Sequence, residues 1–248
     1  SMESVANAAS MASAANTATV ATRSAARSST SSTEAAGGWR TARPNNPRSA
    51  GRREDDGGDF VLASPHHPPM TTQRPGRDIR LVTSRLTLRP TEPADASRAF
   101  EIQSDWAVTR MLRMAAFPPD LGELQDWFCG HSDEWLGGRA YRFAVESAGR
   151  LIGVCDVDEI SEGQGDLGYW LEPAAWGQGV ASEAAQAVAT FAFAQVGLRR
   201  LLSGHAADNP ASGAVLRRLG FKVTGEGAVL YKSRGASVMH IRYDLERP

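Results

Sequence analysis

The amino-acid sequence predicts a mixed α/β fold in which helices flank a central, mostly antiparallel sheet. Segments that alternate between apolar and polar residues recur from about residue 85 to residue 245, which is typical of strands with one buried face. Segments with helical spacing lie between them. Three consecutive strand-like segments within residues 141–171 are joined by short turns, as in an antiparallel meander. These observations place one folded domain at residues 78–248, a usual size for a single domain.

Residues 1–77 have a different composition. They are rich in Ala, Ser, Thr, Pro and Arg, carry a net charge of +3, and contain no apolar run long enough to fold. We therefore expect a disordered Ala/Ser/Arg-rich extension. Residues 2–33 are nearly free of acids and faintly resemble an organellar transit peptide, which leaves organellar import as a minor alternative to a cytoplasmic protein.

Charge and composition narrow the class of ligand. Residues 78–248 carry a net charge of −4, whereas nucleic-acid binding depends on neutralising phosphates, so we expect no nucleic-acid partner. A cationic ligand such as an amine suits this charge. No stretch approaches 18 apolar residues, so no membrane span is expected. Cys129 and Cys155 lack metal-ligand spacing and are predicted to be small core residues, with no metal site.

Capping signals set the first elements. Alternation predicts a strand at residues 85–89. Thr91 is expected to cap a helix that has Pro93 in its first turn and ends near residue 104. Asp120, with Glu123 three residues later, forms a capping-box-like start for a helix that stops at a glycine pair after about residue 136.

The remaining elements follow from the same periodicities. Small residues along one face of the helix at 179–196 allow it to lie close to the sheet, and Gly220 supplies the left-handed end of the next helix. Strands are expected at 141–146, 151–160, 166–171, 201–206, 223–231 and 238–245, and helices at 179–196 and 210–219.

The stretch from Tyr169 to Ala185 carries the main functional signal. A short apolar strand enters a proline turn, then a glycine pair, then an alanine-rich helix. This order directs several backbone N–H groups and the positive end of a helix dipole at one point, which suits a phosphate or pyrophosphate. The alternative is that the glycines serve only a tight strand-to-helix turn. A Rossmann site is excluded, because the third glycine and the ribose-binding acid are absent.

Residues from about 79 to 246 resemble the GNAT acetyltransferase superfamily, specifically its RimJ/RimL-like branch. Three blocks carry the resemblance, in the expected order. Residues 84–90 followed by Asp95 are similar to "RLxLRP…D", residues 168–184 to "GYWLxPxxWGxGxAxEA", and residues 209–212 with 219–221 to "NxxS…GF". Trp176 replaces the Gln or Arg that opens the superfamily's acetyl-CoA loop, whereas Gly179 and Ala181 match it.

The resemblance implies an N-acetyltransferase with acetyl-CoA as cosubstrate. Transfer to a primary amine, either a protein N-terminus or a small molecule, would be direct, because neither cysteine lies in the matched blocks. Trp170 and Leu171 would pair with the pantetheine arm, and the Leu171 N–H would stabilise the oxyanion. The residues implied in cofactor binding are Trp170, Leu171, Trp176, Gly177, Gln178, Gly179, Val180, Ala181, Ser182, Asn209 and Ser212.

Three residues are catalytic candidates: Leu171, Ser212 and Asp166. In the branch, the serine at Ser212 is proposed to protonate the CoA thiolate, although a first-turn helical serine can also be structural. Asp166 is a candidate general base, or else a solvated aspartate at a hairpin end; His205 and water stay open as alternative bases. Further residues considered near the acceptor are Asp156, Asp158, Glu172 and Tyr231.

A second function stays open at the level of sequence. A protein of the same fold could bind acetyl-CoA without turnover, as a sensor or an interaction module, because no general base is unambiguous. Neither the acceptor nor the choice between monomer and homodimer follows from the sequence, since one fold serves many acceptors.

Overall fold

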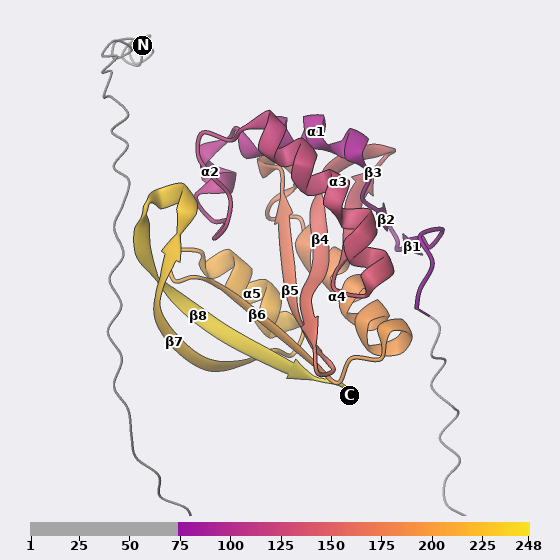
Figure 1. The fold of residues 1–248 in the computed structure, drawn as a ribbon. Helices are drawn as coiled ribbons and strands as arrows, with labels where there is room; N and C mark the ends of the chain where they lie inside the picture. The colour runs from indigo at the N-terminus through magenta and orange to yellow at the C-terminus, as the bar shows by residue number, and fades with distance from the viewer. Residues whose placement is uncertain (1–73) are drawn as a thin grey trace, which may run out of the picture. The chain divides into compact units, whose positions relative to one another are not determined.

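The computed structural model describes residues 74–248, which form an eight-stranded sheet with helices on both faces (Figure 1). The strand order is β1-β2-β3-β4-β5-β6-β8-β7, and only the β5–β6 pair is parallel. The predicted fold class is therefore confirmed. The strands are β1 (Leu81–Val82), β2 (Thr87–Pro90), β3 (Tyr141–Ser147), β4 (Arg150–Ser161), β5 (Gln164–Leu171), β6 (Arg200–Ala206), β7 (Lys222–Tyr231) and β8 (Ala236–Glu246).

The helices form two layers. α1 and α3 pack together over β3 and β4, while α4 packs on β4 and β5 and α5 on β6. The helices are α1 (Ala96–Gln103), α2 (Trp106–Thr109), α3 (Leu121–Gly137), α4 (Val180–Phe191) and α5 (Pro210–Arg218). Shorter helical turns are η1 (Pro93–Asp95), η2 (Pro173–Ala175) and η4 (Lys232–Arg234), and α4 continues as a π-helical segment, η3 (Ala192–Val196).

The core forms where small residues let α4 lie against the sheet. Ala184, Ala185 and Val188 are almost fully buried there, as the sequence predicts. Aromatic rings fill the space between α3, β3 and the end of α4: Trp135 and Phe143 meet edge to face at 5.2 Å, and Phe143 and Phe191 at 5.1 Å. Such geometry adds to the stabilisation from burial. These contacts therefore join α3, β3 and α4 in one buried core.

The two predicted capping signals have different outcomes. The Asp120 carboxylate accepts the Glu123 N–H at 2.8 Å, and the helix ends at Gly138 with φ +68°. The predicted cap at Asp120 and the predicted end of α3 at the glycine pair are therefore confirmed. Thr91 is not the cap of the earlier helix: the turn begins after Glu92, whose N–H donates to the Asp95 carboxylate at 2.7 Å. Thr91 is buried instead, and its hydroxyl forms a hydrogen bond with Nδ1 of His131 at 2.8 Å.

The described chain begins slightly before the predicted domain boundary. Arg74 donates to the Leu136 carbonyl at 2.8 Å, and the Trp135 indole donates to the Pro75 carbonyl at 2.8 Å. Residues 74–77, which the sequence analysis assigned to the extension, thus contact the domain. The predictions for residues 1–73 lie outside the described residues. From residue 74 onward, no helix has the length and apolar character needed to cross a bilayer.

The parallel strands β5 and β6 stay paired over only three residues. Pairing runs from Gln164 opposite Arg200 to Asp166 opposite Leu202 and then stops. Beyond Asp166, β5 continues to Leu171 while paired only with β4. Because the second neighbour is missing, one edge of β5 is open within the sheet, and the candidate site lies there.

Candidate active site

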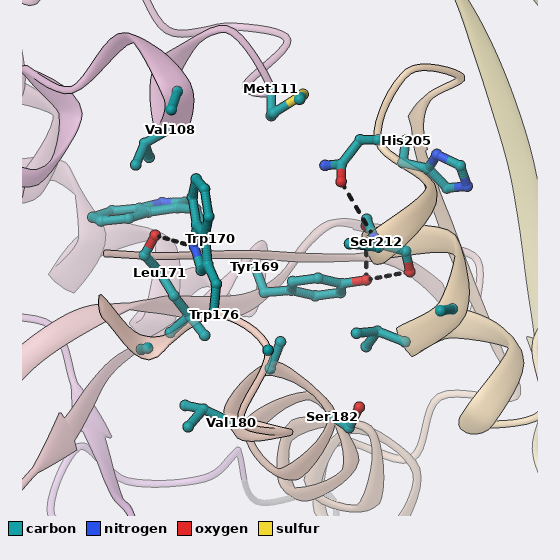
Figure 2. Close-up of a pocket in the computed structure, with 18 of the residues that line it drawn as sticks. Val108, Met111, Tyr169, Trp170, Leu171, Trp176, Val180, Ser182, His205 and Ser212 are labelled. Atoms are coloured by element: carbon teal, nitrogen blue, oxygen red, sulfur yellow. Dashed lines mark hydrogen bonds between the residues drawn. The ribbon is translucent and has the colours of Figure 1, made fainter. Parts of the chain in front are cut away.

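A cavity of about 500 Å³ fills the opening between β5 and β6 (Figure 2). Its walls come from β5, the glycine turn, the start of α4, the end of β6 and the first turns of α5. Of the residues implied in cofactor binding, all except Gln178 line it. The structure thus brings together the second and third sequence blocks, residues 168–184 and 209–212, around one cavity.

The glycine turn has the backbone conformation that only glycine adopts readily. Gly177 has φ +73° and Gly179 has φ +77°, and Gly179 is the N-cap of α4. A Cβ at Gly177 would meet no atom within 4 Å, so this side of the turn is open. At this helix start the first N–H groups lack partners within α4. The turn therefore fits the pyrophosphate of a CoA thioester.

Two arginines, which the sequence analysis did not single out, border this turn. The Arg85 guanidinium donates to the Gln178 carbonyl at 2.9 Å, so Gln178 contributes its backbone to holding the turn. Arg218, on α5, donates to the Ser182 hydroxyl at 3.1 Å. The fold thus places two cationic side chains beside the turn.

The end of β5 presents its backbone to the cavity. The Glu172 N–H donates to the Ile152 carbonyl of β4 at 2.8 Å. Because successive N–H groups of a strand point to opposite sides, the Leu171 N–H is directed away from β4 and toward the opening. The Trp176 indole donates to the Leu171 carbonyl at 2.9 Å, which ties the turn to the strand.

Ser212 lies at the opposite wall, in the first turn of α5. Asn209 caps this helix, because its side-chain oxygen accepts the Ser212 N–H at 3.3 Å. The phenol of Tyr169 reaches across from β5: it donates to the Ser212 carbonyl at 3.1 Å and lies 2.9 Å from the Ser212 hydroxyl (Figure 2). Tyr169 was not a candidate, although its alternation with Leu167 and Leu171 places it on their face.

A second cavity, of about 770 Å³, adjoins the first. Three parts of the fold surround it: the segment between α2 and α3, the middle of strands β4 and β5, and the β7–β8 pair. The carboxylates of Asp156, Asp158 and Asp166 line it. The residues that line both cavities are Met111, Leu112, Tyr169, Trp170 and Gly204.

Of these three aspartates, Asp166 is the one for which no ion pair is found among residues 74–248. Arg142 contacts Asp156 at 2.5 Å and Asp158 at 2.9 Å. Glu172, the fourth expected acid, is paired with Arg98 and lies outside the lining of both cavities.

The surroundings of Asp166 shift its ionisation. Among residues 74–248 no hydrogen bond or ion pair to its side chain is found, and Asp158 lies directly opposite on β4. Burial, followed by the negative charges of Asp158 and Glu159, raises the pKa of Asp166 to about 6, while Arg113 opposes the shift. An isolated carboxylate with a raised pKa in a cavity is a common property of catalytic bases.

His205 is used in the packing of the sheet. Its Nδ1 lies 2.8 Å from the Ala206 carbonyl, which can only accept, so Nδ1 carries the proton. Its Nε2 then accepts from the Tyr243 hydroxyl at 3.2 Å. Both ring nitrogens are thus engaged. Tyr231, another residue considered near the acceptor, lines the second cavity with its hydroxyl 2.8 Å from Nδ1 of His240.

An arch crosses the junction of the two cavities. The η4 turn at the β7–β8 hairpin binds the segment after α2: the Arg234 guanidinium donates to the Arg110 carbonyl at 2.6 Å and the Lys232 N–H to the Arg113 carbonyl at 2.8 Å. Asp208 accepts from Arg110 and Arg234. No local sequence signal predicts this arch, because its three parts are distant in the chain.

The fold and the open strand edge with its glycine turn define an acyltransferase. The chain belongs to the GNAT acetyltransferase family, because the family model described as "Acetyltransferase (GNAT) domain" matches residues 85–222, more than half of the chain. It is accordingly an acetyl-CoA-dependent acetyltransferase, and the predicted resemblance is confirmed.

Similar proteins agree with this assignment. "Uncharacterized N-acetyltransferase p20" of Bacillus licheniformis is 33% identical over 149 residues, which cover 58% of this chain and 83% of that protein. "Ribosomal-protein-serine acetyltransferase" of Escherichia coli is 37% identical over 91 residues, covering 36% of this chain and 50% of that protein. In its fold the chain is also similar to the solved structure of RimL, a ribosomal L7/L12 α-N-protein acetyltransferase in complex with CoA. The TM-score is 0.61 at 23% identity, covering 68% of this chain and 98% of that one.

Proposed function

We propose that this enzyme transfers the acetyl group of acetyl-CoA directly to the α-amine of a protein N-terminus. One observation carries the proposal: the two cavities meet at Tyr169 and Trp170, beside the open edge of β5. A thioester that lies along this edge from the glycine turn and an amine in the second cavity would meet at that junction. Holding both reactants in contact replaces a collision in solution by a reaction within a complex.

The first cavity would hold acetyl-CoA by its backbone and by few side chains. N–H groups of the turn from Gly177 to Ser182 would bind the pyrophosphate at the start of α4. The open edge of β5 at Trp170 and Leu171 would pair with the amide groups of the pantetheine arm, as an added strand does. Asn209 would keep the first turn of α5 in place beside it.

Asp166 would take the proton of the attacking amine, directly or through a water. The α-amino group of a protein has a pKa of about 8, whereas the lysine side chain has one of about 10.4. Transfer to a carboxylate with a pKa of about 6 is less uphill from the α-amine. An ionised Asp166 in a net acidic cavity would also attract the ammonium form before it loses its proton.

The remaining roles fall on Leu171 and Ser212. The thioester supplies the acetyl group: a C–N bond forms, the C–S bond breaks, and one proton in total moves from nitrogen to sulfur. The Leu171 N–H would donate to the acetyl oxygen while it carries negative charge. The Ser212 hydroxyl would donate to the departing sulfur, which favours loss of the thiolate.

A protein acceptor is supported by the relatives and by the shape of the second cavity. Two of the similar proteins, one of them a solved structure, carry the names of ribosomal-protein acetyltransferases. The second cavity is the larger, and it is bordered by two separate chain segments, the α2–α3 linker and the β7–β8 pair, which leaves room for an extended peptide. Ribosomal targets would place the reaction in the cytoplasm.

The test is CoA release from acetyl-CoA with a panel of acceptors. The panel contains peptides with free N-termini, the same peptides with blocked N-termini and a free lysine, a polyamine and an aminoglycoside. We expect turnover with the free N-termini only. Turnover confined to a small-molecule amine would overturn the protein acceptor, and acetyl-CoA binding without turnover on any amine would support a sensor instead.

A further inference from the structure

Tyr169 and Ser212 connect the two arms of the opening where the backbone no longer does. Strand pairing between β5 and β6 stops at Asp166 and Leu202. Three residues further along β5, the Tyr169 side chain spans the gap to α5, which follows β6 (Figure 2). Among residues 74–248, the Tyr169 hydroxyl is the only group found within hydrogen-bond distance of the Ser212 hydroxyl.

The single phenolic proton has two possible acceptors on the same residue. If it points to the Ser212 carbonyl, at 3.1 Å, the phenol oxygen accepts the Ser212 hydroxyl proton, which is then turned away from the cavity. If it points to the Ser212 hydroxyl oxygen, at 2.9 Å, the serine proton is free to point into the cavity. A tyrosine hydroxyl has one donor, so these two arrangements exclude each other.

Burial keeps this phenol protonated. It raises the pKa of Tyr169, and only the hydrogen bond to Ser212 acts in the opposite direction. The phenol is therefore a neutral hydrogen-bond donor at neutral pH. In such surroundings a chain of two hydroxyls polarises cooperatively when a negative charge develops at its end.

We propose that Tyr169 is the positioning residue that makes Ser212 a hydrogen-bond donor to the departing sulfur, by rotating its phenolic proton from the Ser212 carbonyl to the Ser212 hydroxyl. The inference rests on the proposed function. As the C–S bond breaks, the order of donors is Tyr169, then Ser212, then the thiolate. Both hydroxyls keep their own protons in this step, and the thiolate receives its proton afterwards from water or the acid formed on the acceptor side.

The experiment compares Tyr169→Phe, Ser212→Ala and the double variant. A matched control is Tyr141→Phe, because Tyr141 is a buried core tyrosine for which no hydroxyl hydrogen bond is found among the described residues. Steady-state kcat and KM are measured with a reactive amine from the panel. The second readout needs no turnover: the pKa of the thiol of bound CoA, followed by thiolate absorbance from about pH 7 to 10, around the ordinary thiol value of about 8.5.

We expect Tyr169→Phe to lower kcat about tenfold, as for a hydrogen bond to a charged group, with KM for acetyl-CoA within about threefold. In the Ser212→Ala background it should have no further effect, because both residues act on one group. The pKa of bound CoA should rise in both single variants and stay unchanged in Tyr141→Phe. The other titratable or charged residues lining this cavity are Arg110, His205 and Arg218, and they are common to all variants.

Three results would overturn the inference. The first is a bound-thiol pKa in Tyr169→Phe equal to that of the unchanged protein. The second is a multiplicative loss of kcat in the double variant. The third is a loss confined to KM and melting temperature, which would give Tyr169 a structural role only. Absence of turnover in the unchanged enzyme would overturn the proposed function alone, because the thiol pKa still reports on the pair.

Discussion

Arg85 and Glu183 are 98 residues apart in the sequence and form an ion pair of 2.6 Å at the first turn of α4. The Glu183 carboxylate also accepts from Thr83 and Ser84. Burial opposes ionisation, but the hydrogen bonds from Thr83, Arg85 and Ser84 lower the pKa of Glu183 to about 2. The pair joins the first sequence block to the glycine turn and neutralises a carboxylate beside the expected pyrophosphate.

This relationship predicts how Arg85 affects cofactor affinity. Arg85→Ala removes the bond to the Gln178 carbonyl and leaves Glu183 as an unbalanced negative charge near the turn. We expect acetyl-CoA affinity, measured by calorimetry, to fall roughly tenfold, or about 1.4 kcal/mol. The double variant Arg85→Ala with Glu183→Gln should recover part of the loss. An equal or larger loss in the double variant would show that charge is not the cause.

Gly179 tests the turn itself. Gly179→Ala places a Cβ at φ +77°, a conformation costing of order 1 kcal/mol for a residue other than glycine. We expect acetyl-CoA affinity to fall at least tenfold while the fold persists. Gly163→Ala, at φ +79° at the opposite end of β5, is the matched control and should bind normally. Equal affinities of the two variants would argue against the turn as the pyrophosphate site.

Ser212 tests the donor to the leaving group. The helix cap uses the Ser212 N–H and not its hydroxyl, so Ser212→Ala should leave the melting temperature and acetyl-CoA affinity nearly unchanged. We expect kcat to fall by roughly 10²-fold, the usual contribution of one such group. A preserved kcat would leave Ser212 with a structural role only.

The raised pKa of Asp166 predicts how the reaction rate depends on pH. The base must be ionised, so kcat/KM should decline as the pH falls through about 6. Asp166→Asn should lower kcat strongly and abolish this decline. Asp158→Asn removes a negative charge that raises the Asp166 pKa, so it should keep the decline and move it to lower pH. A decline that survives in Asp166→Asn would assign the base elsewhere.

The raised pKa of Asp166 also predicts how the stability of the folded protein depends on pH. A raised pKa in the folded protein means that the protonated form is favoured, so the contribution of Asp166 to stability is present below its ordinary pKa and is lost as the pH rises through about 6. Asp166→Asn should therefore melt at a higher temperature than the unchanged protein near pH 8. The difference should disappear near pH 4. Melting curves across this range provide the measurement.

Gly153 supports the reactive end of β5 from the neighbouring strand. A Cβ at this position would lie 2.1 Å from the Trp170 carbonyl oxygen and 2.8 Å from the Leu171 Cα, which are both backbone atoms. Gly153→Ala should push this backbone toward the cofactor opening, lower stability and reduce acetyl-CoA affinity. Ile152→Val, a loss of one buried methylene costing about 1 kcal/mol, is the control. Similar affinity in both variants would contradict the displacement.

Local sequence signals determined the elements of this protein. Periodicity, the Asp120 cap and the glycine ends depend on neighbours within a few residues, so they could be predicted and are found. The glycine turn could also be predicted, because left-handed φ values and a helix start are local properties. Thr91 does not cap the helix, because its hydroxyl is hydrogen-bonded to His131 on α3.

Only the tertiary structure decided which side chains act together. The end of β5–β6 pairing at Asp166, the contact of Tyr169 with Ser212, and the isolation of Asp166 from Arg142 each depend on strands and helices far apart in the chain. His205 was chemically attractive until its two nitrogens were found engaged. Distances and burial set hydrogen bonding and pKa, and neither can be read from residue type alone. The sequence by itself determined the fold, the family and the glycine turn, whereas packing decided which side chains lie together at the two cavities.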